Sequence, residues 1–187
     1  MTETTPNIDV WMINRDLARA PRYALPSGYS MRFYRQGDVA TWSRVQQATE
    51  KLMSTPPDEA TFEKEYGLDH AYLSERILFL VGPDGREIGT IGAWNDSVFE
   101  NRELGRIHWV AIVPEAQGAG LAKPMLSAAC DVLRAHGYGE VWLWTATGRV
   151  PALNLYLQFG FAPYLREEAE RDAWLAIAPK LKFAIDV

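Results

Sequence analysis

Apolar and polar residues recur with two different periods along the chain, and each period predicts a type of secondary structure. Alternation with period two predicts a strand over residues 29–35, and an unbroken apolar run predicts another over residues 77–81. The sequence Gly-Pro-Asp-Gly at residues 82–85 predicts a tight turn into a further strand over residues 87–94. The front half of the chain therefore contains a predicted hairpin and a separate strand.

Residues typical of helix starts and ends predict two helices between the first strand and the hairpin. Asp38 offers an N-cap before residues 39–50. Pro57 starts a second helix, which ends near Tyr66 because Gly67 interrupts the pattern. Two helices are thus expected between the strand at residues 29–35 and the strand at residues 77–81.

The first 28 residues differ from the rest. Prolines at residues 6, 21 and 26 surround one short apolar cluster, Trp11-Met12-Ile13. We expect an irregular arm that packs against the protein through these few side chains. The predicted organisation is an N-terminal arm over residues 1–28 and one folded domain over residues 29–187.

Strand and helix patterns follow one another in the second half of the chain. The predicted strands cover residues 106–113, 140–145, 161–165 and 174–177, and the predicted helices cover residues 120–136 and 151–159. Together with the hairpin, this order predicts an α/β fold. We expect a mixed, mostly antiparallel central sheet with helices on both faces.

Composition narrows the range of partners and locations. A net charge of −5 argues against nucleic acid as the main partner and suits a cationic substrate. Cys130 is the only cysteine, and the three histidines show no metal-ligand spacing, so neither a disulfide nor a metal site is expected. No apolar run approaches the ~20 residues of a membrane span, and no secretion signal is apparent. We therefore expect a cytoplasmic protein that does not bind a membrane.

The strongest chemical signal lies between a predicted strand and a predicted helix. Residues 113–122 read Val-Pro-Glu-Ala-Gln-Gly-Ala-Gly-Leu-Ala. Gly118, Ala119 and Gly120 let an anion approach the backbone, and the first N–H groups of the following helix face it. The segment predicts a binding site for a pyrophosphate group.

The residues of this loop decide between three known phosphate-binding patterns. A Walker loop requires Gly-Lys-Ser/Thr, which is absent, and a dinucleotide fingerprint requires glycine or alanine where Lys123 stands. The remaining pattern, Gln-x-x-Gly-x-Ala over residues 117–122, resembles the acyl-CoA-binding motif of the GCN5-related N-acetyltransferase (GNAT) superfamily. Residues 152–161 are similar to the later Ala-x-x-Leu-Tyr-x-x-x-Gly-Phe signature of the same family.

The resemblance implies a GNAT-like fold that transfers an acetyl group from acetyl-CoA to an amine without a metal. It implies that Tyr156 lies near the sulfur of coenzyme A and protonates the departing thiolate. It also implies that the strand before the loop pairs with the pantetheine arm and that the Val110 N–H polarises the thioester carbonyl. The residues implied in binding acetyl-CoA are Val110, Ala111, Ile112, Val113, Gln117, Gly118, Ala119, Gly120, Leu121, Ala122 and Arg149. Arg149 stands where many members have asparagine, and a homodimer is the assembly that the family suggests.

The acceptor amine must be neutral to attack, so a base or a cleft that desolvates the amine must help. Strand alternation puts Arg106 and His108 on one face, with Trp109 on the other, and only His108 titrates near neutral pH. His108 also aligns with a histidine base of some family members. Alternatively, His108 only hydrogen-bonds its neighbours, and Glu50, Glu100 or Glu103 or a chain of waters takes the proton.

Two questions stay open at the level of the sequence. A non-catalytic acyl-CoA-binding module would need the loop but not Tyr156, so an enzyme is favoured. The acceptor is not identified, because in this fold it is selected by the helices and loops over about residues 39–73. Four aromatic residues either form walls around a cationic acceptor or, by default, fill the core: Trp42, Tyr66, Tyr72 and Trp94.

Overall fold

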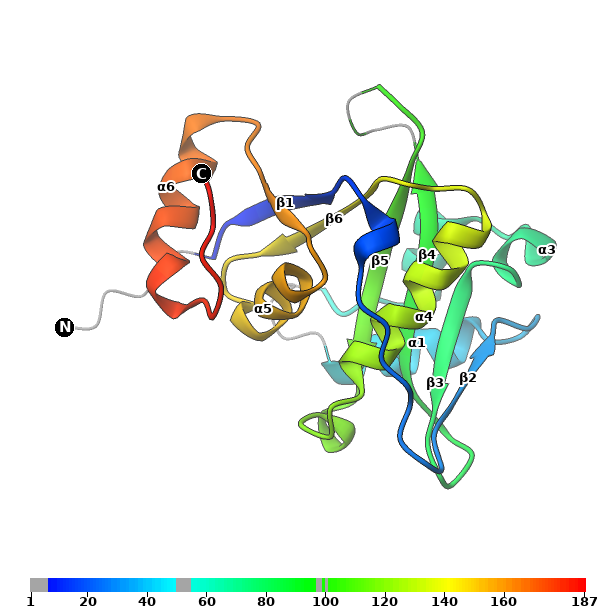
Figure 1. The fold of residues 1–187 in the computed structure, drawn as a ribbon. Helices are drawn as coiled ribbons and strands as arrows, with labels where there is room; N and C mark the ends of the chain where they lie inside the picture. The colour runs from blue at the N-terminus through cyan, green and yellow to red at the C-terminus, as the bar shows by residue number, and fades with distance from the viewer. Residues whose placement is uncertain (1–6, 50–54, 97–98, 100) are drawn as a thin grey trace. The chain divides into compact units, whose positions relative to one another are not determined.

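The computed structural model describes residues 7–49, 55–96, 99 and 101–187. The chain divides into two compact units, and Figure 1 shows the course of the chain through them. The unit that we name the terminal unit contains residues up to Pro21, residues 95–106 and residues 137–187. The central unit contains residues 22–94 and 107–136.

Seven strands in the described residues hydrogen-bond in the order β2-β3-β4-β5-β6-β1-β7. They are β1 (Asp9–Asn14), β2 (Ser30–Phe33), β3 (Ile77–Val81), β4 (Glu87–Asp96), β5 (Leu104–Ile112), β6 (Val141–Ala146) and β7 (Ala162–Tyr164). In the central unit, β3 pairs antiparallel with both β2 and β4. In the terminal unit, β1 lies antiparallel between β6 and β7, and β5 runs parallel to β6 at Gly105↔Val141 and Arg106↔Trp142. The predicted mixed, mostly antiparallel sheet is confirmed.

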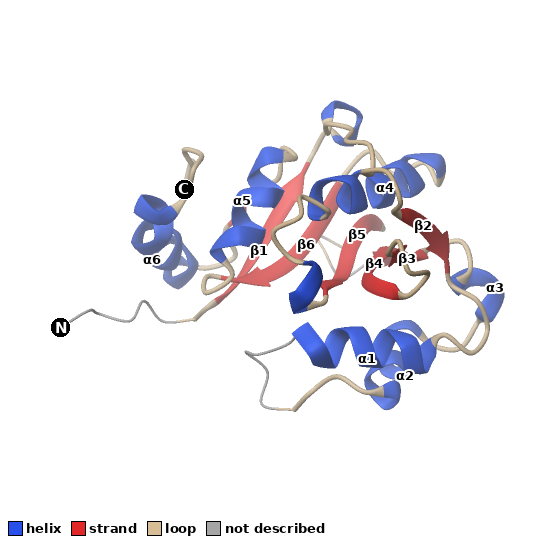
Figure 2. Ribbon diagram, turned by 90° about the horizontal axis from the view of Figure 1, so that it is seen from below, coloured by secondary structure: helices blue, strands red, loops and turns tan. Residues whose placement is uncertain are grey.

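The described residues contain all four predicted helices, as α1, α2, α4 and α5, and two helices that were not predicted, α3 and α6. They are α1 (Val39–Thr49), α2 (Glu59–Tyr66), α3 (His70–Leu73), α4 (Ala122–Ala135), α5 (Val150–Gln158) and α6 (Glu168–Ile177), with short 3-10 helices at Leu17–Arg19, Pro114–Ala116 and Ala178–Lys180. Figure 2 shows α4 on one face of the central unit's strands and α1 and α2 on the other. Among the described helices, none combines the length and the apolar character needed to cross a bilayer.

The predicted irregular arm is wrong for residues 9–14, which form β1. Val10 and Met12 are fully buried, and the strand pairs along its whole length with β6. Burial of Ile13 as well removes the alternation that a half-buried strand would show, so the sequence carries little strand signal. The boundary that we place between residues 28 and 29 stays a prediction.

The predicted strand at residues 174–177 is also wrong, because these residues form the end of α6. The buried residues of that helix, Glu170, Ala173, Trp174 and Ile177, recur every three or four positions. This is the period of a helix with one buried face. The apolar run at residues 174–177 is too short to show this period by itself.

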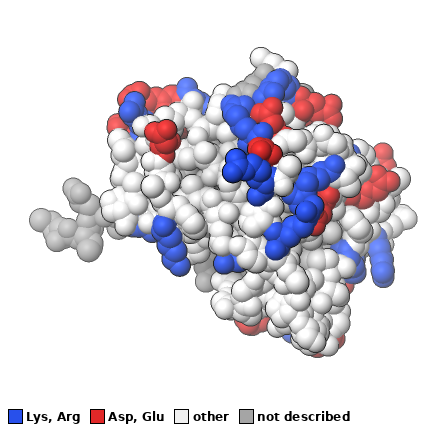
Figure 3. Space-filling view, viewed as in Figure 1, with Lys and Arg blue, Asp and Glu red and all other residues white. Residues whose placement is uncertain are grey.

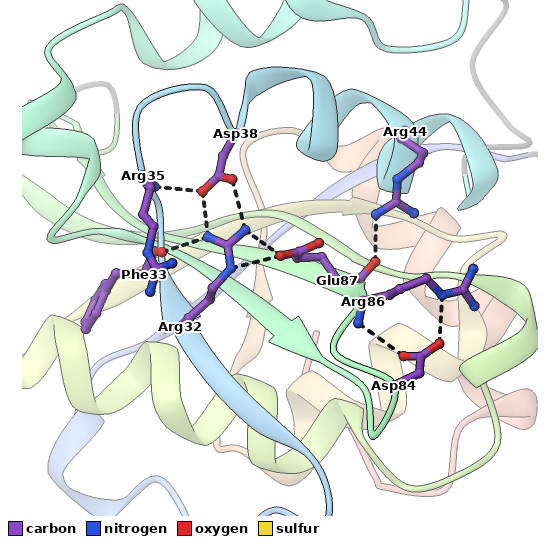
Figure 4. A network of polar contacts seen from close by, with 8 residues as sticks. All are labelled: Arg32, Phe33, Arg35, Asp38, Arg44, Asp84, Arg86 and Glu87. Atoms are coloured by element: carbon purple, nitrogen blue, oxygen red, sulfur yellow. Dashed lines mark hydrogen bonds and ion pairs between the residues drawn. The ribbon is translucent and has the colours of Figure 1, made fainter.

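An ion-pair network attaches the start of α1 to the central strands, as Figure 4 shows. Arg32 donates to the two carboxylate oxygens of Asp38 at 2.6 and 2.9 Å, and to Oε1 of Glu87 at 2.7 Å. Oδ2 of Asp38 also accepts from the backbone N–H of Arg35 at 2.7 Å. Because Asp38 directly precedes α1, these bonds fix the helix to β2 and β4.

We expect Asp38→Asn to lower the free energy of unfolding by about 2 kcal/mol at pH 7, because the amide cannot replace a carboxylate between these donors. Burial disfavours the Asp38 carboxylate, but the hydrogen bonds from Arg32 and Arg35 outweigh it and lower its pKa. Folding therefore gains this stabilisation above the ordinary carboxyl pKa of about 3.9 and loses it as the pH falls further. Urea unfolding of both proteins should show a difference at pH 7 that shrinks below about pH 4.

Asp84→Asn is the control for this prediction. Asp84 forms an exposed pair with Arg86 in the hairpin turn, so its loss should change stability little. An equal loss of stability in the two variants, or a difference for Asp38→Asn that does not depend on pH, would contradict the network's role.

Candidate active site

A kink in β5 shapes the middle of the central unit. Trp109 has a φ of 47°, which is rare for a residue other than glycine and marks an irregular point in the strand. The Trp109 carbonyl accepts from Nε2 of Gln46 at 2.9 Å and from the Thr90 hydroxyl at 3.3 Å. Gln46 and Thr90 are themselves buried and bonded to each other. Helix α1 and strand β4 therefore hold the kink in place.

His108 and Trp109 contact the same carboxylate although they are consecutive in β5. Nε2 of His108 lies 3.0 Å from Oε2 of Glu65 in α2, and Nε1 of Trp109 donates to that oxygen at 3.3 Å. The prediction that alternation separates these two side chains is wrong, because the positive φ of Trp109 interrupts the pleat. Glu65 was not among the residues predicted for the site, since no local pattern in the sequence links α2 to β5.

The four aromatic residues predicted as either core or cation walls differ in burial. Trp42 and Tyr66 are buried in one aromatic cluster, as the default prediction held. Trp94 is partly buried and contacts the ring of Tyr66 at 5.0 Å and that of Tyr72 at 5.2 Å. The Tyr66 ring also lies 5.1 Å from that of His108. A chain of aromatic contacts thus links the His108 ring through Tyr66 to Trp94 and Tyr72, which are only partly buried.

The loop before α4 has the geometry of an anion-binding turn. Gly118 and Gly120 have φ angles of 79° and 75°, and a Cβ atom on either would meet no other atom within 4 Å. From Gly118 to Lys123, no N–H group donates to a backbone carbonyl of the described residues, and the first helical bond runs from Met125 to Leu121. Leu121 is buried and anchors the turn. Residues 118–120 are exposed, so these backbone donors lie at the surface, beside the positive end of a 14-residue helix.

Gln117 begins this loop but has internal partners. Its backbone N–H donates to the Pro114 carbonyl at 3.2 Å, and its side-chain amide donates to the Ile112 carbonyl at 2.8 Å. The Val113 N–H donates to the Ile88 carbonyl at 2.8 Å. Of the predicted cofactor contacts, the Gln117 and Val113 N–H groups and the Ile112 carbonyl are therefore already bonded within the protein. The fit to a pyrophosphate rests on residues 118–122.

Tyr156 and Arg149 belong to the terminal unit, where both lie at α5. Tyr156 is buried, and its ring contacts that of Phe161 at a centroid distance of 6.0 Å. Burial raises the pKa of Tyr156 to about 12, and the nearby charge of Arg149 acts in the opposite direction. At neutral pH the Tyr156 hydroxyl therefore keeps its proton and can act as a donor.

Of the other three carboxylates predicted as possible bases, one has other partners and two lie outside the described residues. Oε1 of Glu103 accepts from the Asn95 amide and from the Tyr138 hydroxyl, both at 3.0 Å. Glu50 and Glu100 lie outside the described residues. Glu65 is therefore the carboxylate that the described residues bring to His108.

Sequence comparisons connect this chain to acetyltransferases. Residues 42–161 match the model of the family described as the Acetyltransferase (GNAT) family. The chain is 30% identical to a mycothiol acetyltransferase of Pseudarthrobacter chlorophenolicus, over 83% of this chain and 50% of the relative. It is 27% identical to a streptothricin acetyltransferase of Streptomyces lavendulae, over 59% of this chain and 57% of that protein. The chain thus spans about half the length of these curated relatives.

Solved structures agree on the fold. A GCN5-related N-acetyltransferase from Sphaerobacter thermophilus is similar with a TM-score of 0.66 and 24% identity, over 85% of this chain and 49% of that one. The ribosomal-protein-S18-alanine N-acetyltransferase of Escherichia coli is similar with a TM-score of 0.58 and 19% identity, over 73% of this chain and 79% of that one. The predicted GNAT-like α/β fold is confirmed.

Proposed function

Because this chain belongs to the acetyltransferase (GNAT) family, we propose that it transfers an acetyl group from acetyl-CoA to a primary amine of a small molecule or a protein. The observation that carries the proposal is the loop over residues 118–122 at the start of α4, whose N–H groups donate to no backbone carbonyl of the described residues. These donors suit the pyrophosphate of coenzyme A, and β5 before the loop suits its pantetheine arm through Val110 and Ala111. Arg149 is proposed as a further contact to the cofactor.

The proposed acceptor chemistry needs a base. An ordinary alkylamine has a pKa of about 10.4, so a neutral amine at pH 7 costs about 4.6 kcal/mol. We propose that His108, which is buried and lies beside the Glu65 carboxylate, lowers this cost by receiving a proton. The lone pair of the amine then attacks the thioester carbonyl carbon and forms the C–N bond.

The leaving group needs an acid. As the C–S bond breaks, the sulfur of coenzyme A takes the electron pair, and we propose that the protonated Tyr156 hydroxyl supplies its proton. Because burial raises the pKa of Tyr156, its hydroxyl holds its proton at neutral pH and has one to donate. In the whole reaction the ammonium form of the acceptor gives up two protons, of which one ends on the thiol and one goes to solvent.

The comparisons bear on the class of acceptor. The relatives and neighbours named above include proteins described as acetyltransferases of mycothiol, of streptothricin and of a ribosomal protein alanine. Figure 3 shows Lys and Arg side chains beside Asp and Glu side chains on the face that it views. Together with the net charge of −5, this supports a small or peptidic amine rather than a nucleic acid. The cytoplasmic location and the homodimer stay predictions.

Thiol release from acetyl-CoA in the presence of a panel of amines tests the proposal. We expect release that depends on both acetyl-CoA and an amine, with the acetylated amine identified by mass spectrometry. Binding of acetyl-CoA without turnover of any amine would instead identify a non-catalytic acyl-CoA-binding module. Failure of every coenzyme A species to bind would refute both.

A further inference from the structure

We propose that Glu65 forms the acceptor subsite of this protein. Its carboxylate binds the ammonium group of a cationic amine and passes one proton of that group to His108. This inference rests on the proposed function and adds to it the residue that meets the acceptor and the charge that the acceptor carries. Neither the loop before α4 nor the motif of α5 contains Glu65, so the assignment comes from the contacts within the central unit.

The order of the two groups follows from their exposure. The side chain of His108 is 6% exposed and that of Glu65 is 29% exposed, although the two atoms that join them are only 3.0 Å apart. An amine that arrives from solvent therefore meets the carboxylate before the imidazole. A carboxylate also attracts the charged form of the amine, which predominates at neutral pH, whereas a protonated imidazole would repel it.

The carboxylate is held in a fixed orientation. Oε2 lies within reach of both the His108 imidazole and the Trp109 indole, and the kink at Trp109 brings these two consecutive side chains to it. Gln46 and Thr90 both donate hydrogen bonds to the Trp109 carbonyl. Strained backbone that is supported in this way is common at functional sites, where it positions reacting groups.

The surroundings suit a cation. The rings of Tyr66 and Trp109 contact the His108 ring, Trp94 packs against Tyr66 in turn, and the face of such a ring attracts ammonium groups. Two arginines of neighbouring elements have other partners: Arg44 of α1 donates to the Glu87 carbonyl, and Arg32 of β2 pairs with Asp38. Arg76 is buried and lies over the ring of Tyr72. A carboxylate beside a cluster of aromatic rings therefore favours a cationic acceptor over a neutral or anionic one.

The proton transfers balance within this subsite. The ammonium gives its first proton to the Glu65–His108 pair, which releases it to water, and the neutral amine attacks the thioester. The tetrahedral adduct then loses its second N–H proton to the same pair as the C–S bond breaks, while the thiolate receives its proton from Tyr156. The pair releases this second proton to solvent, and solvent returns a proton to the Tyr156 oxygen, so that the net reaction releases one proton.

A cation that cannot be acetylated tests the subsite without turnover. We expect the protein saturated with coenzyme A to bind choline about tenfold more tightly than its neutral isostere 3,3-dimethylbutanol, measured by calorimetry. Glu65→Gln should abolish this preference. Glu63→Gln is the matched control, because Glu63 lies in the same helix but is exposed, and it should keep the preference.

Kinetics test the proton transfer. With acetyl-CoA and the best primary amine of a panel, Glu65→Gln should lower kcat/KM for the amine about 100-fold and leave the KM for acetyl-CoA unchanged. His108→Gln removes the titrating group but retains a donor for Glu65, so it should lower kcat while the KM for the amine changes little. A merely structural role of Glu65 would instead change both KM values together.

The outcomes separate this inference from the proposed function. If the wild type acetylates amines and Glu65→Gln behaves like Glu63→Gln, the subsite is wrong and the acetyltransferase assignment stands. If no amine is acetylated, the proposed function fails, while the choline preference and its loss in Glu65→Gln still decide whether Glu65 binds a cation.

Discussion

Tyr156→Phe should lower kcat for acetyl transfer by about 100-fold or more while changing the affinity for acetyl-CoA by less than about twofold. The substitution removes only the hydroxyl, since phenylalanine can keep the packing of the ring against Phe161. Loss of the acid forces coenzyme A to leave as an unprotonated thiolate, which raises the barrier for breaking the C–S bond. The effect therefore belongs to the chemical step and not to binding.

Stopped-flow measurement of thiol release in a single turnover, with a separate binding titration, checks this expectation. Tyr164→Phe is a suitable control, because Tyr164 is another tyrosine of the terminal unit and packs in an aromatic cluster in β7. It should retain nearly full activity. If Tyr156→Phe turns over as fast as the wild type, the thiolate takes its proton from another source.

The parts of the site that the sequence predicts are those encoded by consecutive residues. The loop over residues 117–122 and the helix that carries Tyr156 were both located, because small residues, a helix start and a signature tyrosine stand at fixed spacings. The start of α4 was displaced by two residues, from Gly120 to Ala122. Since Gly118 and Gly120 adopt positive φ angles, the chain cannot enter the helix before Leu121.

The parts that the sequence did not predict depend on long-range contacts. Glu65 precedes His108 by 43 positions, and only the packing of α2 on β5 brings them together. Likewise β1 pairs with β6 more than 120 residues later, as in Asn14↔Val141, and is buried between two strands. A pattern of apolar residues reports burial and not the partner that provides it, so these contacts needed the structure.

The kink in β5 shows a further limit of pattern-based prediction. Regular alternation would send His108 and Trp109 to opposite faces, but one positive φ turns both toward Glu65. No residue near the kink is a glycine or a proline that would mark it in the sequence. The bonds from Gln46 and Thr90 that support the kink come from other elements. The site is therefore built where local preference and tertiary packing disagree.

Gly118→Ala and Gly120→Ala should each weaken acetyl-CoA binding about 10- to 100-fold, which corresponds to the loss of one or two hydrogen bonds to a charged group. Each added methyl group would lie in open space beside the loop, where a bound pyrophosphate would meet it. The left-handed backbone at these positions also becomes strained, which costs roughly 1–2 kcal/mol of stability per substitution. Two effects are thus mixed in each variant, and a control must separate them.

Gly137→Ala separates them, because Gly137 has a φ of 87° and equally open surroundings but follows the far end of α4. It should lose about as much stability in urea unfolding as the loop variants, since the backbone strain is the same. Its affinity for acetyl-CoA, measured by calorimetry, should nevertheless stay at the wild-type value. Wild-type affinity in all three variants would mean that the loop does not hold the pyrophosphate. A loss of affinity confined to Gly118→Ala and Gly120→Ala, at equal loss of stability, assigns the binding to the loop itself and not to global stability.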